Sequence, residues 1–129
     1  MKLFLTIVVV VIVMMLLARA AVGQRSQTSD EKVLYELRKA GSDLTKPHEI
    51  YHWLYFDDKA DAETAAEQIR ANDFSVSSID ETEKYGWRVL AHKRMIPSGV
   101  AVAGVSKVLE SVAAANHGKY DGWETQVVK

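Results

Sequence analysis

Residues 118–125 read Gly118-Lys119-Tyr120-Asp121-Gly122-Trp123-Glu124-Thr125, and this stretch sets two large aromatic side chains on either side of an Asp-Gly pair. Asp and Gly both tolerate positive φ angles, so Asp121-Gly122 indicates a turn, a β-bulge or a close approach of two backbones. Tyr120 and Trp123 combine large apolar rings with polar tips, and such side chains are costly to expose. The stretch therefore predicts a bulged strand whose aromatic residues anchor a core or an interface.

Outward from this strand, hydrophobic periodicity and turn residues predict a regular alternation of strands and helices. The expected strands cover residues 50–56, 74–79, 87–95 and 120–128, and residues 80–86 form a polar loop. The expected helices run from the Thr28 capping box to Gly41, from Asp57 or Asp58 to Asn72-Asp73, and from Pro97-Ser98 to just before Gly118. This β-α-β-β-α-β order with one preceding helix predicts a ferredoxin-like α+β sandwich, with two helices on one face of a four-stranded antiparallel sheet.

Four stretches, taken in order, resemble one known family. They are Ala40-Gly41-Ser42-Asp43 followed by Ile50-Tyr51-His52-Trp53-Leu54; the helix of residues 65–74; Trp87-Arg88-Val89-Leu90-Ala91; and the more specific Tyr120-Asp121-Gly122-Trp123. Over about residues 30–125 the chain resembles the regulator of ribonuclease activity B family. The resemblance implies a protein that binds and inhibits ribonuclease E and has no chemistry of its own. This chain departs from the strongly acidic, soluble members of that family, because it has no acidic tail and carries an added apolar segment.

Length and composition limit the classes of function. A chain of 129 residues supports one domain. The absence of cysteine excludes disulfides, thiolate catalysis and zinc–thiolate sites. Beyond residue 20, 14 Lys and Arg stand against 17 Asp and Glu, since only Lys2 and Arg19 lie before it, and the formal charge of this part is −3. Such a balance disfavours direct binding of nucleic acid, which needs clustered cations.

The N-terminal segment has two interpretations. Residues 3–22 are almost wholly apolar, and at about 1.5 Å per residue they are about long enough to cross a hydrocarbon core of ~30 Å as a single-pass anchor. As a signal peptide, the segment offers Ala18-Arg19-Ala20 or Ala21-Val22-Gly23 as cleavage sites. The anchor is favoured, because the run is long for a signal core and Arg19 lies inside the cleavage region.

This interpretation divides the chain into three parts. Residues 1–22 form the membrane anchor or signal peptide, residues 23–28 a linker, and residues 29–129 the domain similar to the ribonuclease regulator. An anchor predicts a membrane protein, with the domain favoured on the cytoplasmic side. Cleavage would instead predict a secreted or periplasmic protein.

Aromatic side chains on the first strand are the candidate binding residues. Alternation places the aromatic residues on one sheet face and the aliphatic ones on the other; the aromatic set is Tyr51, Trp53 and Tyr55, and the aliphatic set is Ile50, Leu54 and Phe56. The aliphatic set suits the helix-covered face, so the aromatic set is expected on the open face. Because the last strand neighbours the first in this fold, Tyr120 or Trp123 would join it there.

Two explanations of this aromatic face stay open. Exposed aromatic patches tend to mark interaction sites, so the face would bind a partner. Alternatively, the first helix covers the face through Val33, Leu34 and Leu37. An RNA-stacking platform is disfavoured by the charge of the domain and by the lack of a basic, Gly-aromatic signature.

No catalytic constellation stands out. His52 and His92 lie on strands expected to be neighbours, and with Asp57 or Asp58 nearby they would form a metal site, but no supporting ligand spacing is present. We therefore expect the histidines to be surface residues of strands and the carboxylates to stabilise helix ends. Asp121 with Gly122 is expected to form a turn. The sequence predicts no catalytic residue, no metal and no cofactor.

Two functional hypotheses follow. The first is a membrane-tethered regulator that binds a protein partner, such as a ribonuclease, through Tyr51, Trp53, Tyr55, Tyr120 and Trp123. The second is an exported or envelope module that binds a small ligand or another protein. The side of the membrane on which the domain lies distinguishes them.

Overall fold

An antiparallel sheet with helices packed on one face makes up residues 27–129, the part of the chain that the computed structural model describes. The elements are α2 (Gln27–Lys39), β1 (His48–Phe56), α3 (Lys59–Ala71), β2 (Ser75–Glu81), β3 (Trp87–Met95), α4 (Gly99–Ala115) and β4 (Gly118–Thr125). The predicted element order is confirmed. Of the strands, β3 has its predicted bounds, whereas β1 begins two residues earlier and β4 ends three residues earlier than expected.

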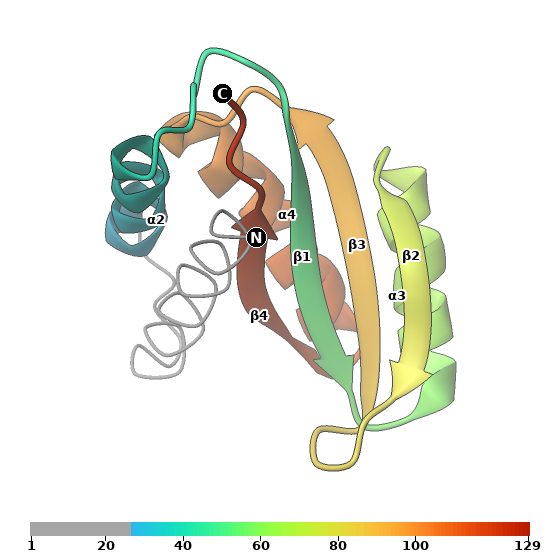
Figure 1. Ribbon diagram of the computed structural model, residues 1–129. Coiled ribbons are helices and arrows are strands. Elements are labelled where there is room, and N and C mark those ends of the chain that lie inside the picture. Colours follow the sequence, from blue (N-terminus) through green and yellow to red (C-terminus); the bar gives the residue numbers. More distant parts are fainter. Residues whose placement is uncertain (1–26) are drawn as a thin grey trace.

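The strands follow the order β2-β3-β1-β4, and each neighbouring pair is antiparallel. Figure 1 shows α3 and α4 behind the sheet, with α2 beside the upper part of α4. This is the ferredoxin-like arrangement that the order of elements predicts. It makes β1 and β3 the central strands, so side chains of β1 have neighbours on both sides.

Capping residues set the ends of the helices on the sheet. Asp58 is the N-cap of α3, and its carboxylate accepts a hydrogen bond from the backbone N–H of Asp61 at 2.9 Å. Ser98 has the same role for α4. Asp73 follows α3 with a φ of 67°, a left-handed conformation that Asp tolerates. The predicted start at Asp57 or Asp58 and the stop at Asn72-Asp73 are therefore confirmed.

The larger core lies between the sheet and helices α3 and α4. α3 contributes mainly alanines, which let the helix lie close to the sheet, and the strands contribute larger apolar residues. The buried members are Leu54, Phe56, Ala62, Ala65, Ala66, Ile69, Phe74, Val89, Ala91, Leu109, Val112 and Ala113.

A second, smaller core holds α2 against the rest of the domain. Its buried members come from α2, β1, α4 and β4, and they are Val33, Leu34, Leu37, Ile50, Val102 and Trp123. Trp123 is 1% exposed, and its indole Nε1–H donates to the buried carboxylate of Asp30 at 2.9 Å. Burying a carboxylate without a hydrogen bond is costly, so this bond and the buried ring together fix α2 onto β4.

β4 contains the predicted bulge at the Asp-Gly pair. Tyr120 lies opposite Leu54 and Gly122 lies opposite Trp53, so Asp121 is one extra residue between these pairs. Gly122 has a φ of 118°, a conformation open to glycine but strained for other residues. The turn or structural role expected for Asp121 and Gly122 is therefore confirmed as a β-bulge.

The bulge corrects one expectation. Without it, Tyr120 and Trp123 would face opposite sides of the sheet, since they are three positions apart. The extra residue shifts the alternation, and both side chains face the helices, where Tyr120 packs against the larger core and Trp123 lies in the smaller one. The expectation that Tyr120 or Trp123 joins the open face was therefore wrong.

The position of α2 decides between the two explanations of the aromatic face. Val33, Leu34 and Leu37 pack on the helix side of the sheet and not on its open side. The alternative in which these residues cover the aromatic side chains of β1 is therefore wrong.

A polar network explains why Gly41-Ser42-Asp43 precedes the first strand. The Nδ1–H of the buried His48 ring donates to the carbonyl of Lys46 at 2.8 Å, and Nε2 contacts the hydroxyl of Ser42 at 2.6 Å. The Ser42 oxygen also accepts the backbone N–H of Val128 at 3.0 Å, and Asp43 donates its N–H to the Val128 carbonyl. The turn before β1 is thus joined to the segment that follows β4.

Residues 1–22, which carry the predicted anchor or signal peptide, lie outside the described residues. Within residues 27–129, no helix is long and apolar enough to cross a membrane.

We expect Trp123→Ala to lower the free energy of unfolding by about 3–5 kcal/mol, the range for truncating a buried large aromatic residue. Trp123→Phe keeps a ring but removes the donor to Asp30, and a loss of about 1–3 kcal/mol is expected. Chemical denaturation of a fragment of residues 24–129 measures both values. Tyr35→Ala is the control, because Tyr35 is 57% exposed. A loss below about 1 kcal/mol for Trp123→Ala would contradict the core role.

Candidate functional site on the open face of the sheet

The face of the sheet opposite α3 and α4 carries a row of aromatic side chains on β1. Tyr51, Trp53 and Tyr55 are half-buried and alternate with the buried residues of this strand. Successive residues on one face of a strand are about 6.6–6.8 Å apart, so the row is roughly 13 Å long. Among residues 27–129, no helix lies over it (Figure 1). These three residues are called the aromatic row below, and their predicted common face is confirmed.

A hydrogen-bonded ring supports Tyr51 at one end of the row. His92 of β3 lies opposite Tyr51, and the two rings stack with centroids 5.0 Å apart and an interplanar angle of 29°. The Nδ1–H of His92 donates to Glu49 Oε2 at 2.6 Å. Because this contact already restricts the Tyr51 ring, less side-chain entropy remains to be lost when a partner binds.

Trp53 lies beside the bulge of β4. Its cross-strand neighbour there is Gly122, which has no side chain and is nevertheless buried. An aromatic residue opposite a strand glycine covers the exposed backbone. Trp53 therefore contributes to the packing of the bulge as well as to the open face.

Glu124 of β4 is the acidic neighbour of the row. It lies opposite Tyr51, and burial raises the pKa of its carboxyl above the ordinary value of 4.5. Partial removal of this carboxylate from water disfavours its charged form. The open face thus holds one carboxyl group whose charge carries a cost in the isolated domain.

The β2–β3 hairpin adds a fourth aromatic residue, Tyr85, which sequence analysis missed because residues 80–86 were treated only as a polar loop. Tyr85 is 52% exposed, and its ring contacts Tyr55 edge to face, with centroids 5.8 Å apart. The available signal in the sequence was a large aromatic residue, Tyr85, directly before a glycine in an otherwise polar loop. Tyr85 extends the aromatic row beyond the end of β1.

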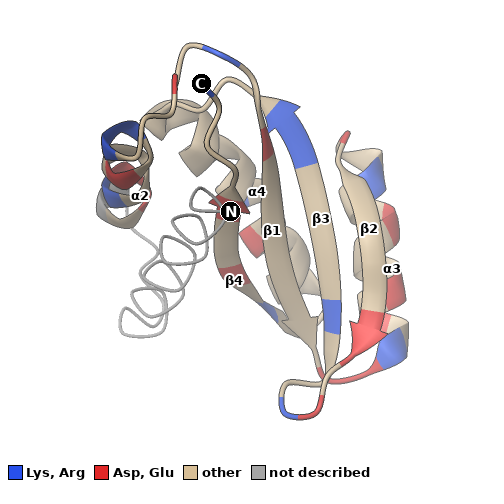
Figure 2. Ribbon diagram, viewed as in Figure 1, with Lys and Arg blue, Asp and Glu red and all other residues tan. Residues whose placement is uncertain are grey.

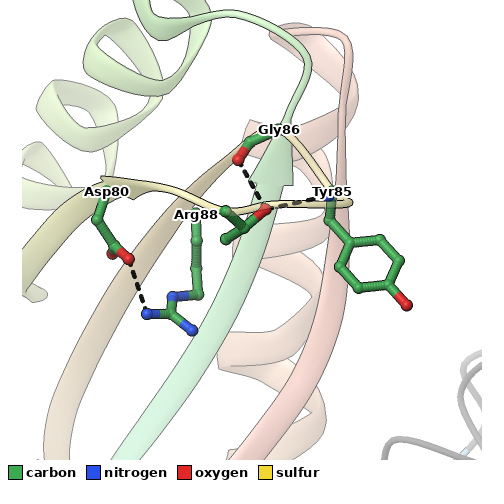
Figure 3. Close-up of polar contacts among 5 residues, drawn as sticks. Asp80, Tyr85, Gly86 and Arg88 are labelled. Atoms are coloured by element: carbon green, nitrogen blue, oxygen red, sulfur yellow. Dashed lines mark hydrogen bonds and ion pairs between the residues drawn. The ribbon is translucent and has the colours of Figure 1, made fainter.

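Hydrogen bonds of Thr82 hold this hairpin in shape. The backbone N–H and the hydroxyl of Thr82 donate to the Gly86 carbonyl at 2.7 and 2.8 Å, and the hydroxyl oxygen accepts the N–H of Tyr85 at 3.0 Å. Figure 3 shows Tyr85 pointing away from the hairpin, and the ion pair of Arg88 with Asp80 at 2.8 Å joining β3 to β2. These bonds fix the backbone of the hairpin at Tyr85 before any partner arrives.

Charges of both signs surround the aromatic row. Figure 2 shows Lys and Arg on β3 and β4, and Asp and Glu on β1, β2 and β4, without one continuous region of a single sign on the strands. Such a surface lacks the basic track along which a phosphate backbone binds. It suits a partner whose charges are also mixed.

The histidines differ from the expectation. His52 faces the helices, is fully buried, and its Nδ1 lies 2.7 Å from the hydroxyl of Tyr120, whereas His92 lies on the open face. The two rings are on opposite faces of the sheet, so the expectation that His52 and His92 could meet was wrong. The expected surface position is also wrong for His52 and for the buried His48. In the part of the chain described, no group of His, Cys, Asp or Glu is placed to hold a metal ion.

The fold and this face define a class of protein, an α+β domain with a row of half-buried aromatic residues on the open face of its sheet. Comparison with known families matches residues 27–125 to the family Regulator of ribonuclease activity B, and the chain belongs to this family. The resemblance found in the sequence is thereby confirmed. Proteins of this family regulate ribonuclease activity by binding and not by catalysis. No curated protein sequence matches the chain.

Glu124→Gln should make the domain more stable at pH 7. Because burial raises the pKa of Glu124, the folded state binds more protons than the unfolded state between the ordinary value of 4.5 and the raised value. The stability of the parent chain therefore falls as the pH rises through this window, and the variant does not show this loss. Thermal unfolding from pH 3.5 to 8 measures it. Glu83→Gln on the exposed hairpin is the control, and a variant advantage that persists unchanged at pH 3.5 would contradict the prediction.

Proposed function

We propose that this protein is a membrane-tethered regulator that binds a ribonuclease of the ribonuclease E type through the open face of its sheet and slows RNA cleavage without catalysis of its own. The observation that carries the proposal is the aromatic row, which no helix of residues 27–129 covers. Membership of the ribonuclease regulator family supports the class of partner. Interfaces concentrate binding energy in Tyr and Trp residues, which supports the choice of surface.

Charge supports contact with the enzyme and not with its RNA. The chain has 16 Lys and Arg against 17 Asp and Glu, and both signs are spread over the sheet (Figure 2). A protein that competed for RNA directly would need clustered cations to displace the ions around the phosphates. Inhibition is therefore expected to come from occupying a surface of the enzyme.

The tether is the part of the proposal that rests on residues 3–22. Their almost wholly apolar character and the position of Arg19 favour retention as an anchor over cleavage. Residues 23–26 span at most about 14 Å, at roughly 3.5 Å per residue, before α2 begins at Gln27. A cytoplasmic domain held this close to the membrane would meet partners that are themselves concentrated at its surface.

In a binding assay with purified ribonuclease E, the full chain should bind the enzyme and slow its cleavage of an RNA oligomer, and binding should persist after nuclease treatment. Tyr51→Ala combined with Trp53→Ala should weaken binding by about tenfold or more, because hot-spot aromatic residues carry most interface energy. Tyr35→Ala is the matched control, exposed on α2. Thermal unfolding of each variant separates lost contact from lost structure. The proposed binding through the open face would be overturned if nuclease treatment abolished binding, or if the double substitution left the affinity unchanged.

The tether predicts that the full-length chain stays in the membrane fraction after a high-salt wash, with its N-terminus intact in a mass measurement of the intact protein. Two reporter enzymes should each be fused after residue 129. The reporter that works in the cytoplasm should be active, and the reporter that works only outside the cytoplasm should be inactive. A mature N-terminus near Ala21 or Gln24, or a reporter active outside the cytoplasm, would refute the tethered regulator. That result would favour the exported module that binds a small ligand or another protein.

A further inference from the structure

A pocket opens where the aromatic row ends. It has a volume of about 390 Å³ and is lined by residues 55–57 at the end of β1, residues 84–86 of the hairpin, residues 117–119 where α4 passes into β4, and Asp121. Tyr55 belongs to both the row and the pocket. We propose that this pocket anchors the protein partner by taking one aromatic side chain that stands next to a carboxylate. This inference rests on the proposed function, because it assumes a protein partner on the open face.

Two glycines bring the walls of the pocket close to β1. A side chain on Gly86 would collide with the carbonyl oxygen of Phe56, and one on Gly118 would collide with the Phe56 ring. The hairpin and the start of β4 therefore approach β1 more closely than a side chain at either position would allow. Because Thr82 fixes the hairpin, the pocket exists before binding, as most ligand sites do.

The walls favour an aromatic side chain. Tyr55 and Tyr85 stand edge to face, at an interplanar angle of 63°, and a third ring can add the same type of contact. The volume lies near the lower end of the range for ligand sites, about 300–1,000 Å³, so it suits one side chain and not an extended ligand. Tyr85 is more than half exposed, and a bound ring would bury part of this area.

The charges around the pocket favour a neighbouring carboxylate. Lys84 and Lys119 are exposed, and neither makes an ion pair with another residue of the part described. Asp57 and Asp121 also line the pocket, and His117 contacts Asp61 at 3.5 Å. The two ammonium groups complement one carboxylate next to the bound ring. The two lining aspartates oppose a dense anion such as a phosphate, so an acidic peptide is favoured over a nucleotide.

The direct test is a titration of the full 129-residue chain, purified in detergent, with two synthetic pentapeptides. One has Phe between two Asp residues, and the other has Phe between two Lys residues. The acidic peptide should shift the backbone amide signals of Gly86, Gly118 and Lys119 to saturation. The basic peptide should bind at least about tenfold more weakly, because the lysines select the charge. Equal binding of both peptides, tighter binding of adenosine monophosphate, or no saturating shift at these residues would overturn the proposal.

Single substitutions define the subsite. Tyr85→Ala and Lys84→Glu should each weaken binding of the acidic peptide by about fivefold or more. The matched controls are Tyr35→Ala and Lys107→Glu, which change an exposed tyrosine of α2 and an exposed lysine of α4. Loss of binding in the controls would contradict the assignment. Binding by a fragment of residues 24–129 but not by the full chain would identify the chain's own N-terminal segment as the occupant and would also overturn it.

The subsite and the proposed function fail in different ways. If the ribonuclease binds and requires Tyr51 and Trp53 but tolerates Tyr85→Ala and Lys84→Glu, the partner uses the row and not the pocket. If the acidic peptide binds the pocket but the ribonuclease does not bind the chain, the pocket is an anchor for a different protein.

Discussion

One extra residue in β4 controls which aromatic side chains face which way. Because Asp121 is added between the pairs of Tyr120 with Leu54 and of Gly122 with Trp53, the alternation of β4 shifts by one position. Tyr120 and Trp123 then both lie under the helices. The aromatic residues of β1 stay on the open face, where Trp53 lies opposite Gly122 of β4 and not opposite a large ring. The separation of core and surface aromatic residues depends on this bulge.

The two faces of the sheet obtain their rigidity in different ways. On the helix side, close packing of alanines and branched residues is joined by a buried hydrogen bond from Trp123 to Asp30. On the open side, local polar contacts hold the aromatic side chains, such as that of His92 with Glu49, and Thr82 holds the hairpin. A binding surface fixed in advance loses less entropy when its partner arrives. The architecture therefore suits a protein whose function is recognition.

Two of the stretches that resemble the family build the scaffold. Ser42 of the Gly-Ser-Asp turn joins β1 to the segment after β4, and the Tyr-Asp-Gly-Trp stretch supplies the bulge and the buried Trp123. Neither of these stretches presents its side chains as the main part of the open face. A third stretch, residues 50–54 of β1, carries Tyr51 and Trp53 of the aromatic row. The residues that resemble the family therefore include part of the open face as well as parts of the scaffold.

The sequence by itself determined the order of elements, the helix caps, the bulge and the common face of Tyr51, Trp53 and Tyr55, because these depend on local periodicity and on the φ preferences of Asp and Gly. Only the tertiary structure decided that Trp123 reaches Asp30, since those residues are 93 positions apart. The position of α2, the opposite faces of His52 and His92, and the meeting of Tyr85 with Tyr55 were decided in the same way. Each depends on how distant segments pack or on register, and a bulge or a pairing shift of one residue reverses the face of every later side chain.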